Sequence, residues 1–304
     1  LTLVKDVAVG YGPDSLAFSE DGRKLVIANE GEPIKDYAKD PAGSIGIIDI
    51  KGRAGSIWRH GNETFTYTEL GFGGLTLPAG IRIKAGADQA NDIEPEYVSI
   101  LGHYAYVTLQ ENNGAAKVNL KTNTIEKIFA LGSVDFSTQL VDINDQDGAG
   151  KTTLFKPVLG NSVAGLRMAD AVAAFSTKGK DYFMTANEGD GRDYGNYSDE
   201  VRRLPRLKTL KEDETTPYTA FGSRSVSIFD AKTGDLVWDS GNTLEAIAIA
   251  ANVYDDTRSD DKGVEPEGVV VAKLNGRTYA IVSLERTTSS MLAVFDISKP
   301  AETR

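Results

Sequence analysis

Internal repetition is the feature of this sequence that most constrains its fold. Four segments share one pattern, in which an acidic residue, an apolar run, a short polar turn, a second apolar run and an acidic or amide cluster follow one another. The segments are residues 13–32, 94–113, 169–190 and 265–286. Their apolar runs are short, rich in β-branched and aromatic residues, and bounded by Gly, Asn or Asp, which is typical of antiparallel hairpins. The pattern therefore predicts several stacked copies of one β-unit.

Further strands follow these hairpins. Third strands are predicted at residues 44–50, 116–120, 225–230 and 292–297, and a fourth strand at residues 236–239. Units of four short antiparallel strands are typical of the blades of a β-propeller. We therefore predict an all-β fold, a β-propeller of four-stranded antiparallel blades, with residues 1–304 forming a single propeller domain.

The spacing of the repeats is uneven. Equivalent acidic residues in the first two segments, Asp14 and Glu96, are 82 residues apart, and the next two intervals, to Asp170 and then Glu267, are 74 and 97 residues. A four-stranded blade needs only about 40 to 50 residues. Two explanations remain open: a weaker blade follows each strong repeat, or long insertions interrupt the repeats.

One segment has the composition of an inserted loop. Residues from about 193 to 219 are rich in Arg, Lys, Glu and Pro, and a helical turn is expected at residues 199–204. The best helix candidate elsewhere is residues 244–251. The chain begins near an inner strand and ends after an outer one, while a propeller closes to bury its strand edges. We therefore expect the propeller in this chain to be incomplete and part of a longer one.

The charge balance narrows the range of partners. The chain has 33 Lys and Arg against 44 Asp and Glu, a formal net charge of −11. Such a chain repels the phosphate backbone of nucleic acids, and no basic stripe offsets the repulsion, so nucleic acid is not an expected partner. Cations suit this balance better. No apolar run approaches the roughly 18 residues that span a bilayer, so we do not expect the chain to cross a membrane.

Cysteine and histidine usage excludes several kinds of site. The chain has no cysteine, which rules out disulfides, thiolate metal sites and a cysteine nucleophile. Its two histidines, His60 and His103, are 43 residues apart. This scarcity argues against a histidine-rich zinc site and makes a Ser-His-Asp triad improbable.

Acidic residues occupy equivalent positions in the four hairpins. In an antiparallel hairpin, the start of the first strand and the end of the second lie at the same end. Four acidic pairs should therefore meet: Asp14 with Glu30, Glu96 with Glu111, Asp170 with Glu188, and Glu267 with Glu285. If the first strands line the propeller channel, these carboxylates converge at one end near the axis. We call this set the acidic rim.

Two interpretations of the acidic rim remain open. Hard oxygen ligands at this density favour Ca²⁺, which takes about six to eight oxygens. The candidate metal ligands are Glu30, Glu94, Glu96, Glu111, Asp170, Glu188, Asp190, Glu265, Glu267 and Glu285. Alternatively, nearby arginines pair with the carboxylates and merely close each blade, because structural ion-pair networks mimic functional ones. The arginines near the rim are Arg192, Arg224, Arg258 and Arg286.

Two acidic loops are weaker candidates for cation sites. Residues 142–148 (Asp-Ile-Asn-Asp-Gln-Asp-Gly) are similar to a calcium loop, but the glutamate expected at its twelfth position is absent. We favour a solvated acidic turn there. The charged loop at residues 255–263 leads directly into the fourth repeat. It either folds over the rim and adds ligands or stays solvated.

Several rim segments resemble the choice-of-anchor I domain family. They are residues 29–33, 92–97, 107–113, 185–190, 258–268 and 284–287, which match the family in order along nearly the whole chain. The family consists of secreted and surface-anchored proteins, including the mesenchyme-specific cell-surface glycoproteins of biomineralising animals, and its bacterial members are often labelled alkaline-phosphatase-like. The resemblance implies a β-propeller in an extracellular, cell-surface or periplasmic location, without a settled activity.

This sequence departs from the family pattern in three places. Family members usually continue by roughly a blade or two at each end, in line with the expectation of an incomplete propeller. The loop after Asp193 is shorter here and lacks an aspartate–glycine-rich stretch, which weakens a calcium site in that loop. Residues 167–170 (Arg-Met-Ala-Asp) stand where a proline is expected before the aspartate.

Two functions are consistent with these features. The first is a binding module that uses Ca²⁺ to hold a surface polymer, a mineral or a phosphorylated small molecule. The second is a metal-dependent phosphoesterase in which rim carboxylates hold the metal and activate water. Its candidate ligands are Glu96, Glu111, Glu188, Glu267 and Glu285, with Arg192, Arg258 or Arg286 on phosphate. No residue stands out as a nucleophile or general base, so whether the chain is an enzyme stays open, and we prefer the binding module.

Overall fold

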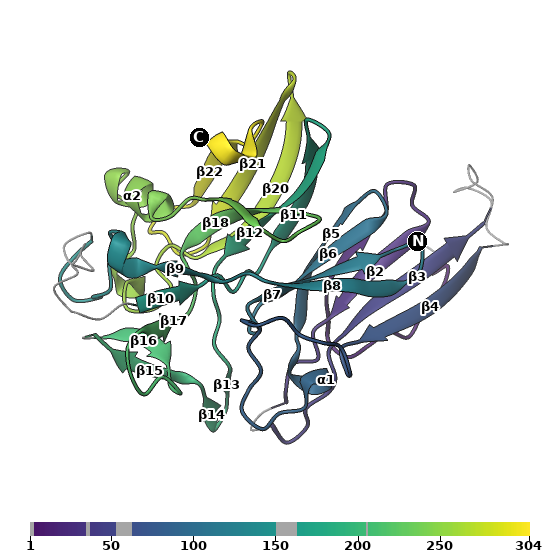
Figure 1. The fold of residues 1–304 in the computed structure, drawn as a ribbon, viewed down its shortest axis with the longest axis horizontal. Helices are drawn as coiled ribbons and strands as arrows, with labels where there is room; N and C mark the ends of the chain where they lie inside the picture. The colour runs from purple at the N-terminus through teal and green to yellow at the C-terminus, as the bar shows by residue number, and fades with distance from the viewer. Residues whose placement is uncertain (1–2, 35–36, 53–62, 150–162, 205) are drawn as a thin grey trace.

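Four antiparallel sheets follow one another along the chain (Figure 1). The computed structural model describes residues 3–34, 37–52, 63–149, 163–204 and 206–304. Blade 1 consists of β1 (Pro13–Phe18), β2 (Lys24–Asn29), β3 (Ser44–Lys51) and β4 (Thr64–Gly71). Blade 2 consists of β5 (Pro95–Leu101), β6 (Tyr104–Leu109), β7 (Gly114–Asn119) and β8 (Thr124–Ala130).

The second half of the chain repeats this arrangement. Blade 3 consists of β11 (Val172–Thr177), β12 (Lys180–Asn187), β18 (Ser225–Asp230) and β19 (Leu236–Asp239). Blade 4 has three strands, β20 (Pro266–Leu274), β21 (Arg277–Leu284) and β22 (Met291–Asp296). The predicted all-β fold of four-stranded antiparallel propeller blades is confirmed.

The blades pack face to face in chain order. Strand β5, the first strand of blade 2, contacts β1 of blade 1 and β11 of blade 3. Strand β11 in turn contacts β20 of blade 4. Apolar side chains fill each junction; between blades 2 and 3, for example, the rings of Tyr106, Phe183 and Phe229 are stacked. In the part of the chain that the structure describes, the four blades form an open arc rather than a closed ring, which agrees with an incomplete propeller.

The two ends of the arc expose apolar side chains. Leu16, Val98 and Val269 occupy equivalent positions on the first strands β1, β5 and β20, each two residues after the acidic residue of the rim. Val98 and Val269 are buried against the preceding blade, whereas Leu16 is 61% exposed. At the other end of the arc, Val270 on β20 is 60% exposed. Both exposed faces therefore carry apolar side chains, like those that fill the junctions between neighbouring blades.

Two connections between strands add a fifth sheet. One connection carries β9 (Ser133–Asp135), the 3₁₀ helix η2 (Phe136–Thr138) and β10 (Val163–Leu166). The other lies between β12 and β18 and carries β13 (Asp193–Tyr194), β14 (Tyr197–Ser198), β15 (Glu200–Arg203), β16 (Leu207–Leu210) and β17 (Tyr218–Ala220). The sheet order is β15-β16-β17-β10-β9, with β10 and β17 parallel. Long insertions, and not additional weak blades, therefore explain the uneven spacing of the repeats.

The helical turn expected at residues 199–204 is wrong. Glu200–Arg203 form strand β15, which pairs antiparallel with β16. Leu207 on β16 is fully buried, and β16 also pairs with β17. Pairing with neighbouring strands and burial of one face outweigh the weak local preference of this short charged segment.

Short helices complete the fold. The expected helix at residues 244–251 is confirmed as α2 (Thr243–Ala250), which buries Leu244 and Ala248 in the core of blades 3 and 4. The others are α1 (Gln89–Asp92) and the 3₁₀ helices η4 (Asp256–Arg258) and η5 (Pro300–Glu302). Among the described residues, no helix is both long enough and apolar enough to cross a membrane.

Candidate functional site: the acidic rim

Three first strands carry their rim acid at a break in strand pairing. The register of β1 with β2 shifts between Pro13 and Ser15, so that Asp14 is the extra residue. Similar shifts occur around Glu96 on β5 and at Glu267 on β20. Such bulges re-aim a side chain, and a proline is tolerated at the first position of a strand because no ladder hydrogen bond is needed there. The Pro-acid sequence thus places these carboxylates at the end of each blade.

The carboxylates of Asp14, Glu30 and Glu96 form a first cluster. Each offers one oxygen, and these oxygens all lie within 4.8 Å of one another. Asp14 and Glu30 belong to blade 1 and Glu96 to blade 2, so the cluster bridges two blades. In the described parts of the chain, no cationic side chain forms an ion pair with any of the three. We call this group the blade 1–2 cluster.

Crowding without a cation changes how these groups ionise. Burial, with repulsion from Glu32 and Asp14, raises the pKa of Glu30 to about 7. Burial and the neighbouring Glu111 raise the pKa of Glu96 to about 11. Both raised pKa values mean that the charged form of the carboxylate is disfavoured, and a bound cation would lower these pKa values again.

Glu111 adds a buried carboxylate beside the blade 1–2 cluster. Its side chain is 4% exposed, and its Oε2 atom has no hydrogen-bond partner. Burial, together with Glu94 and Asp190, raises its pKa well above the usual range. A buried acceptor without a partner is costly. Glu111 lines the same cavity as Asp14, Glu30 and Glu96 but lies outside the group of oxygens within 4.8 Å, so a cation bound in the cavity would offset its charge.

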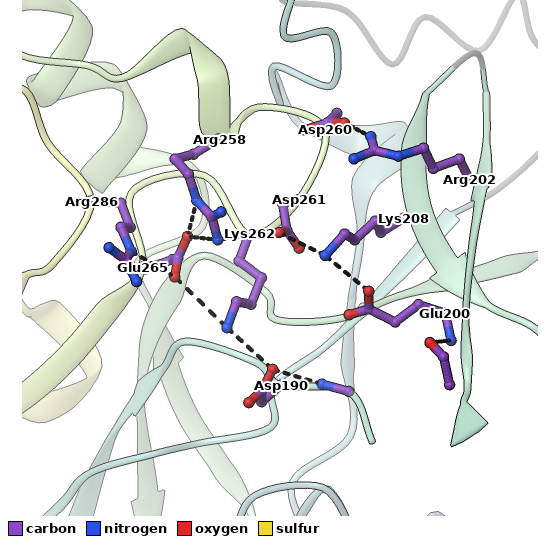
Figure 2. Close-up of polar contacts among 12 residues, drawn as sticks. Asp190, Glu200, Arg202, Lys208, Arg258, Asp260, Asp261, Lys262, Glu265 and Arg286 are labelled. Atoms are coloured by element: carbon purple, nitrogen blue, oxygen red, sulfur yellow. Dashed lines mark hydrogen bonds and ion pairs between the residues drawn. The ribbon is translucent and has the colours of Figure 1, made fainter. Parts of the chain in front are cut away.

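A second cluster contains Glu188, Glu265 and Glu285, whose oxygens also lie within 4.8 Å of one another. This cluster is neutralised by cationic side chains, and Figure 2 shows Arg258, Lys262 and Arg286 around Glu265. Lys262 Nζ lies 2.9 Å from Glu188 Oε1 and 3.7 Å from Glu265 Oε2. Arg258 Nη2 lies 2.6 Å from Glu265 Oε1. The ion-pair interpretation therefore describes this half of the rim, which we call the paired cluster.

Arg286 completes the paired cluster. Its Nη2 atom lies 3.0 Å from Glu285 Oε1, and its Nε atom lies 3.5 Å from Glu265 Oε2. Glu267 lies nearby on β20, and partial burial of its carboxyl, with repulsion from Glu285, raises its pKa. Arg286, one of the candidate phosphate ligands, is thus already held by two carboxylates.

The charged loop at residues 255–263 folds over the rim, whereas the expectation that it also adds metal ligands stays a prediction. Asp260, Asp261 and Lys262 are all buried. Lys262 reaches Glu188 and lies 3.3 Å from Asp190, while Asp261 pairs with Lys208 of β16 at 2.9 Å. The loop brings a cation to the rim, and Figure 2 shows it joined to the fifth sheet through the pair of Asp261 with Lys208.

A cavity of about 410 Å³ lies at the rim. Its lining combines both halves of the rim with the fifth sheet. The lining residues are Asp14, Glu30, Glu32, Glu96, Gln110, Glu111, Asp190, Gly191, Asp193, Tyr194, Glu200, Lys208, Arg258, Asp261 and Lys262. The space is therefore strongly acidic and large enough for an ion and part of a small ligand.

Two further candidates, Glu94 and Asp170, do not line this cavity. Tyr194 donates a hydrogen bond to Glu94 Oε2 at 2.8 Å, and burial raises the pKa of Glu94 to about 8. Burial, with Glu188 and Glu267, raises the pKa of Asp170 to about 8. Asp170 precedes β11, and its backbone N–H bonds to Ala186 O at 3.1 Å. The sequence therefore located the rim carboxylates, but they fall into two electrostatically different groups.

Two of the arginines do not line the cavity. Arg192 is fully buried, with its Nη2 atom 2.9 Å from Asp92 Oδ2. Arg224 is also buried and pairs with Glu245 at 2.7 Å. Both link inserted segments to the body of the fold. Lys262 and Lys208, by contrast, were not singled out from the sequence, although Lys262 lies within the longest family-like segment, residues 258–268.

The acidic turn at residues 142–148 lies outside this cavity. Oxygens of Asp142, Asp147 and Asp256 lie within 4.8 Å of one another. The backbone N–H of Gly148 donates to Asp256 Oδ2 at 3.1 Å. The turn is therefore tied to the start of the charged loop.

The family model of the choice-of-anchor I domain matches residues 1–218 and 204–300. This chain belongs to the choice-of-anchor I domain family. No curated protein is a significant match to its sequence.

Three solved structures are similar to this choice-of-anchor I domain at low identity. Hydrazine synthase of Kuenenia stuttgartiensis is 13% identical, with a TM-score of 0.43, over 100% of this chain and 52% of that one. The Cps50 (Swd1) β-propeller domain of Myceliophteria thermophila is 10% identical, with a TM-score of 0.32, over 95% and 74%. Dihydro-heme d1 dehydrogenase NirN in complex with DHE is 11% identical, with a TM-score of 0.30, over 97% and 57%. The chain thus spans about half the length of the hydrazine synthase chain.

The family-like segments of this choice-of-anchor I domain gather at the rim. Residues 29–33 and 107–113 supply Glu30 and Glu111, and residues 92–97 supply Glu94 and Glu96. The other three segments, residues 185–190, 258–268 and 284–287, supply the paired cluster and Lys262. The segments that resemble the family in sequence therefore supply most of the acidic rim.

Proposed function

We propose that this choice-of-anchor I domain is a surface β-propeller binding module that holds Ca²⁺ at the blade 1–2 cluster. The ligands would be Asp14, Glu30, Glu96 and Glu111. One observation carries the proposal: three carboxylates converge within 4.8 Å without a cationic partner among the described residues, beside a buried carboxylate oxygen that has no partner. Family membership supports an extracellular, cell-surface or periplasmic location.

Calcium fits this donor set. All four proposed ligands offer hard oxygens, and Ca²⁺ accepts about six to eight oxygens in flexible geometry. Four carboxylates leave coordination positions for water or for a bound ligand. A divalent ion would also favour the charged state of Glu30 and Glu96, whose pKa values are raised in its absence.

The contacts of three arginines favour ligand binding over phosphoester hydrolysis as the function of the rim. Arg192, proposed from the sequence to bind phosphate, is fully buried against Asp92. Arg258 and Arg286 are held by Glu265 and Glu285. A phosphoesterase needs cationic groups to stabilise its anionic transition state, and these guanidinium groups are engaged elsewhere.

Thermal unfolding of the full chain in excess Ca²⁺ and in excess chelator tests the proposal. A ligand that binds only the folded state at 100 times its dissociation constant stabilises it by about 2.7 kcal/mol. We expect a corresponding rise in the unfolding temperature with Ca²⁺. The rise should be lost in Glu96→Gln, which keeps the side-chain shape and removes the charge.

Glu20→Gln is the matched control, because Glu20 is an exposed carboxylate in the β1–β2 turn at the opposite end of blade 1. It should keep the full response to Ca²⁺. A wild-type chain whose unfolding temperature is the same with Ca²⁺ and with chelator would rule out the cation site.

A further inference from the structure

The cavity at the rim has an unusual charge balance. Its lining contains nine carboxyl groups but only three cationic side chains, Lys208, Arg258 and Lys262. One bound Ca²⁺ would offset two of the surplus negative charges and leave the rest. Like charges brought together in a partly buried site repel strongly, because little water screens them.

None of the three cationic side chains is free to receive an anion. Lys262 lies 2.9 Å from Glu188 and 3.3 Å from Asp190. Lys208 lies 2.9 Å from both Glu200 and Asp261. Figure 2 shows the pairs of Lys262 with Asp190, of Lys208 with Glu200 and Asp261, and of Arg258 with Glu265. An anionic ligand that paired with these side chains would have to break their ion pairs and leave carboxylates unpaired.

A site for a ligand is nevertheless indicated by Glu111. This side chain is only 4% exposed, its Oε2 atom has no partner, and it lines the cavity beside Asp14, Glu30 and Glu96. A cation on these four carboxylates has coordination positions left over, since Ca²⁺ takes about six to eight oxygens. Neutral hydroxyl oxygens can fill them without adding negative charge.

We infer that the cation at the blade 1–2 cluster binds a neutral carbohydrate through a pair of vicinal hydroxyl groups, and that the cavity excludes phosphorylated and other anionic ligands. The inference rests on the proposed cation site and names the ligand class of that site. Tyr194 also lines the cavity, and an aromatic ring presents an apolar face on which the C–H groups of a sugar can pack.

An array of immobilised glycans tests the inference on the full chain. The array pairs neutral glycans ending in mannose, galactose, fucose or glucose with 6-phosphorylated, sulfated and uronic-acid counterparts. In Ca²⁺ we expect binding to at least one neutral glycan, with a signal at least tenfold weaker on its anionic counterpart. The signal should disappear in chelator and in Glu96→Gln.

A second variant isolates the role of charge. Glu32 and Asp193 line the cavity, are exposed and are not proposed Ca²⁺ ligands. The double variant Glu32→Gln/Asp193→Asn should keep the Ca²⁺ response in thermal unfolding while its binding to anionic glycans increases. Glu20→Gln, at the other end of the blade, should change neither signal.

Two results would overturn the inference. One is a chain that responds to Ca²⁺ in thermal unfolding but binds no neutral glycan. The other is stronger binding of a phosphorylated or sulfated glycan than of its neutral counterpart by the Ca²⁺-loaded chain. A chain without any response to Ca²⁺ would instead contradict the proposed cation site, so the two failures are distinguishable.

Discussion

The glutamates of the two rim clusters depend on neighbouring glycines. The sequence Asn-Glu-Gly occurs at residues 29–31 and again at residues 187–189. Gly31 and Gly189 have φ angles of +77° and +89°, a region that is open mainly to glycine. A Cβ atom on Gly31 would lie 2.5 Å from the Gly43 backbone nitrogen, and one on Gly189 would lie 2.0 Å from that of Gly222. Both glycines thus follow a rim glutamate directly and lie where two backbone segments are in close contact.

Gly31→Ala tests this requirement, with Gly22→Ala as the control. Gly22 also has a positive φ angle, +66°, but a Cβ atom added there would meet nothing within 4 Å. We expect Gly22→Ala to lower the free energy of unfolding by about 1–2 kcal/mol, the cost of left-handed backbone for a residue with a Cβ atom. Gly31→Ala should cost more and weaken the response to Ca²⁺. Equal losses in urea unfolding would show that the backbone near Gly31 relaxes at no cost.

The sequence predicts the rim carboxylates better than their partners. Hairpin register alone brings Asp14 to Glu30, because strand pairing fixes which ends meet. Lys262 and Glu188, by contrast, are 74 residues apart, and their contact depends on how a long loop crosses the rim. No local pattern contains that information. The split into an uncompensated and a paired cluster therefore required the structure.

Among whole elements, the strands of the blades could be predicted from the sequence better than the strands of the fifth sheet. The blade strands are long, apolar and bounded by turn residues, so their hairpins could be predicted from the sequence. The strands of the fifth sheet have at most four residues, and β10 pairs in parallel with β17, more than fifty residues later. Short polar strands held by distant partners give little periodic signal. This is why residues 199–204 were wrongly expected to form a helical turn.

Asp170, which lies just before β11, gives the rim a pH dependence. Burial, with repulsion from Glu188 and Glu267, raises the pKa of Asp170 to about 8 from its usual value near 3.8. The folded chain therefore holds a proton that the unfolded chain has lost at neutral pH. Stability from this group is complete below about pH 4 and is lost as the pH rises toward 8. In chelator, we expect the free energy of unfolding to fall between pH 5 and pH 8.

Asp170→Asn should remove part of this fall, because an amide does not titrate. Urea unfolding at pH 5, 6, 7 and 8 in chelator measures the slope for the variant and for wild type. Asp235→Asn is the control, since Asp235 is an exposed residue of the β18–β19 turn, and its slope should match that of wild type. An unchanged slope in Asp170→Asn would mean that other rim acids account for the pH dependence.

At the scale of the whole molecule, the rim sits on an arc with two apolar ends. Leu16 at one end is 61% exposed, and Val270 at the other is 60% exposed. Leu292 and Val294 on β22 are exposed on the same sheet as Val270. Because Val294 and Val270 both pair with Ile281, they lie on one face. Exposed apolar patches of this kind favour association or aggregation.

Adjacent valines on β20 test whether this face is open in solution. Val269 is buried against blade 3, whereas Val270 points to the opposite face of the same strand. Val269→Thr should lower the free energy of unfolding by about 1–3 kcal/mol, because it buries a hydroxyl group in an apolar contact. Val270→Thr should change it by less than about 0.5 kcal/mol and reduce binding of an apolar dye. If both variants lost the same free energy in urea unfolding, the Val270 face would be covered in solution, and the loss would then depend on protein concentration.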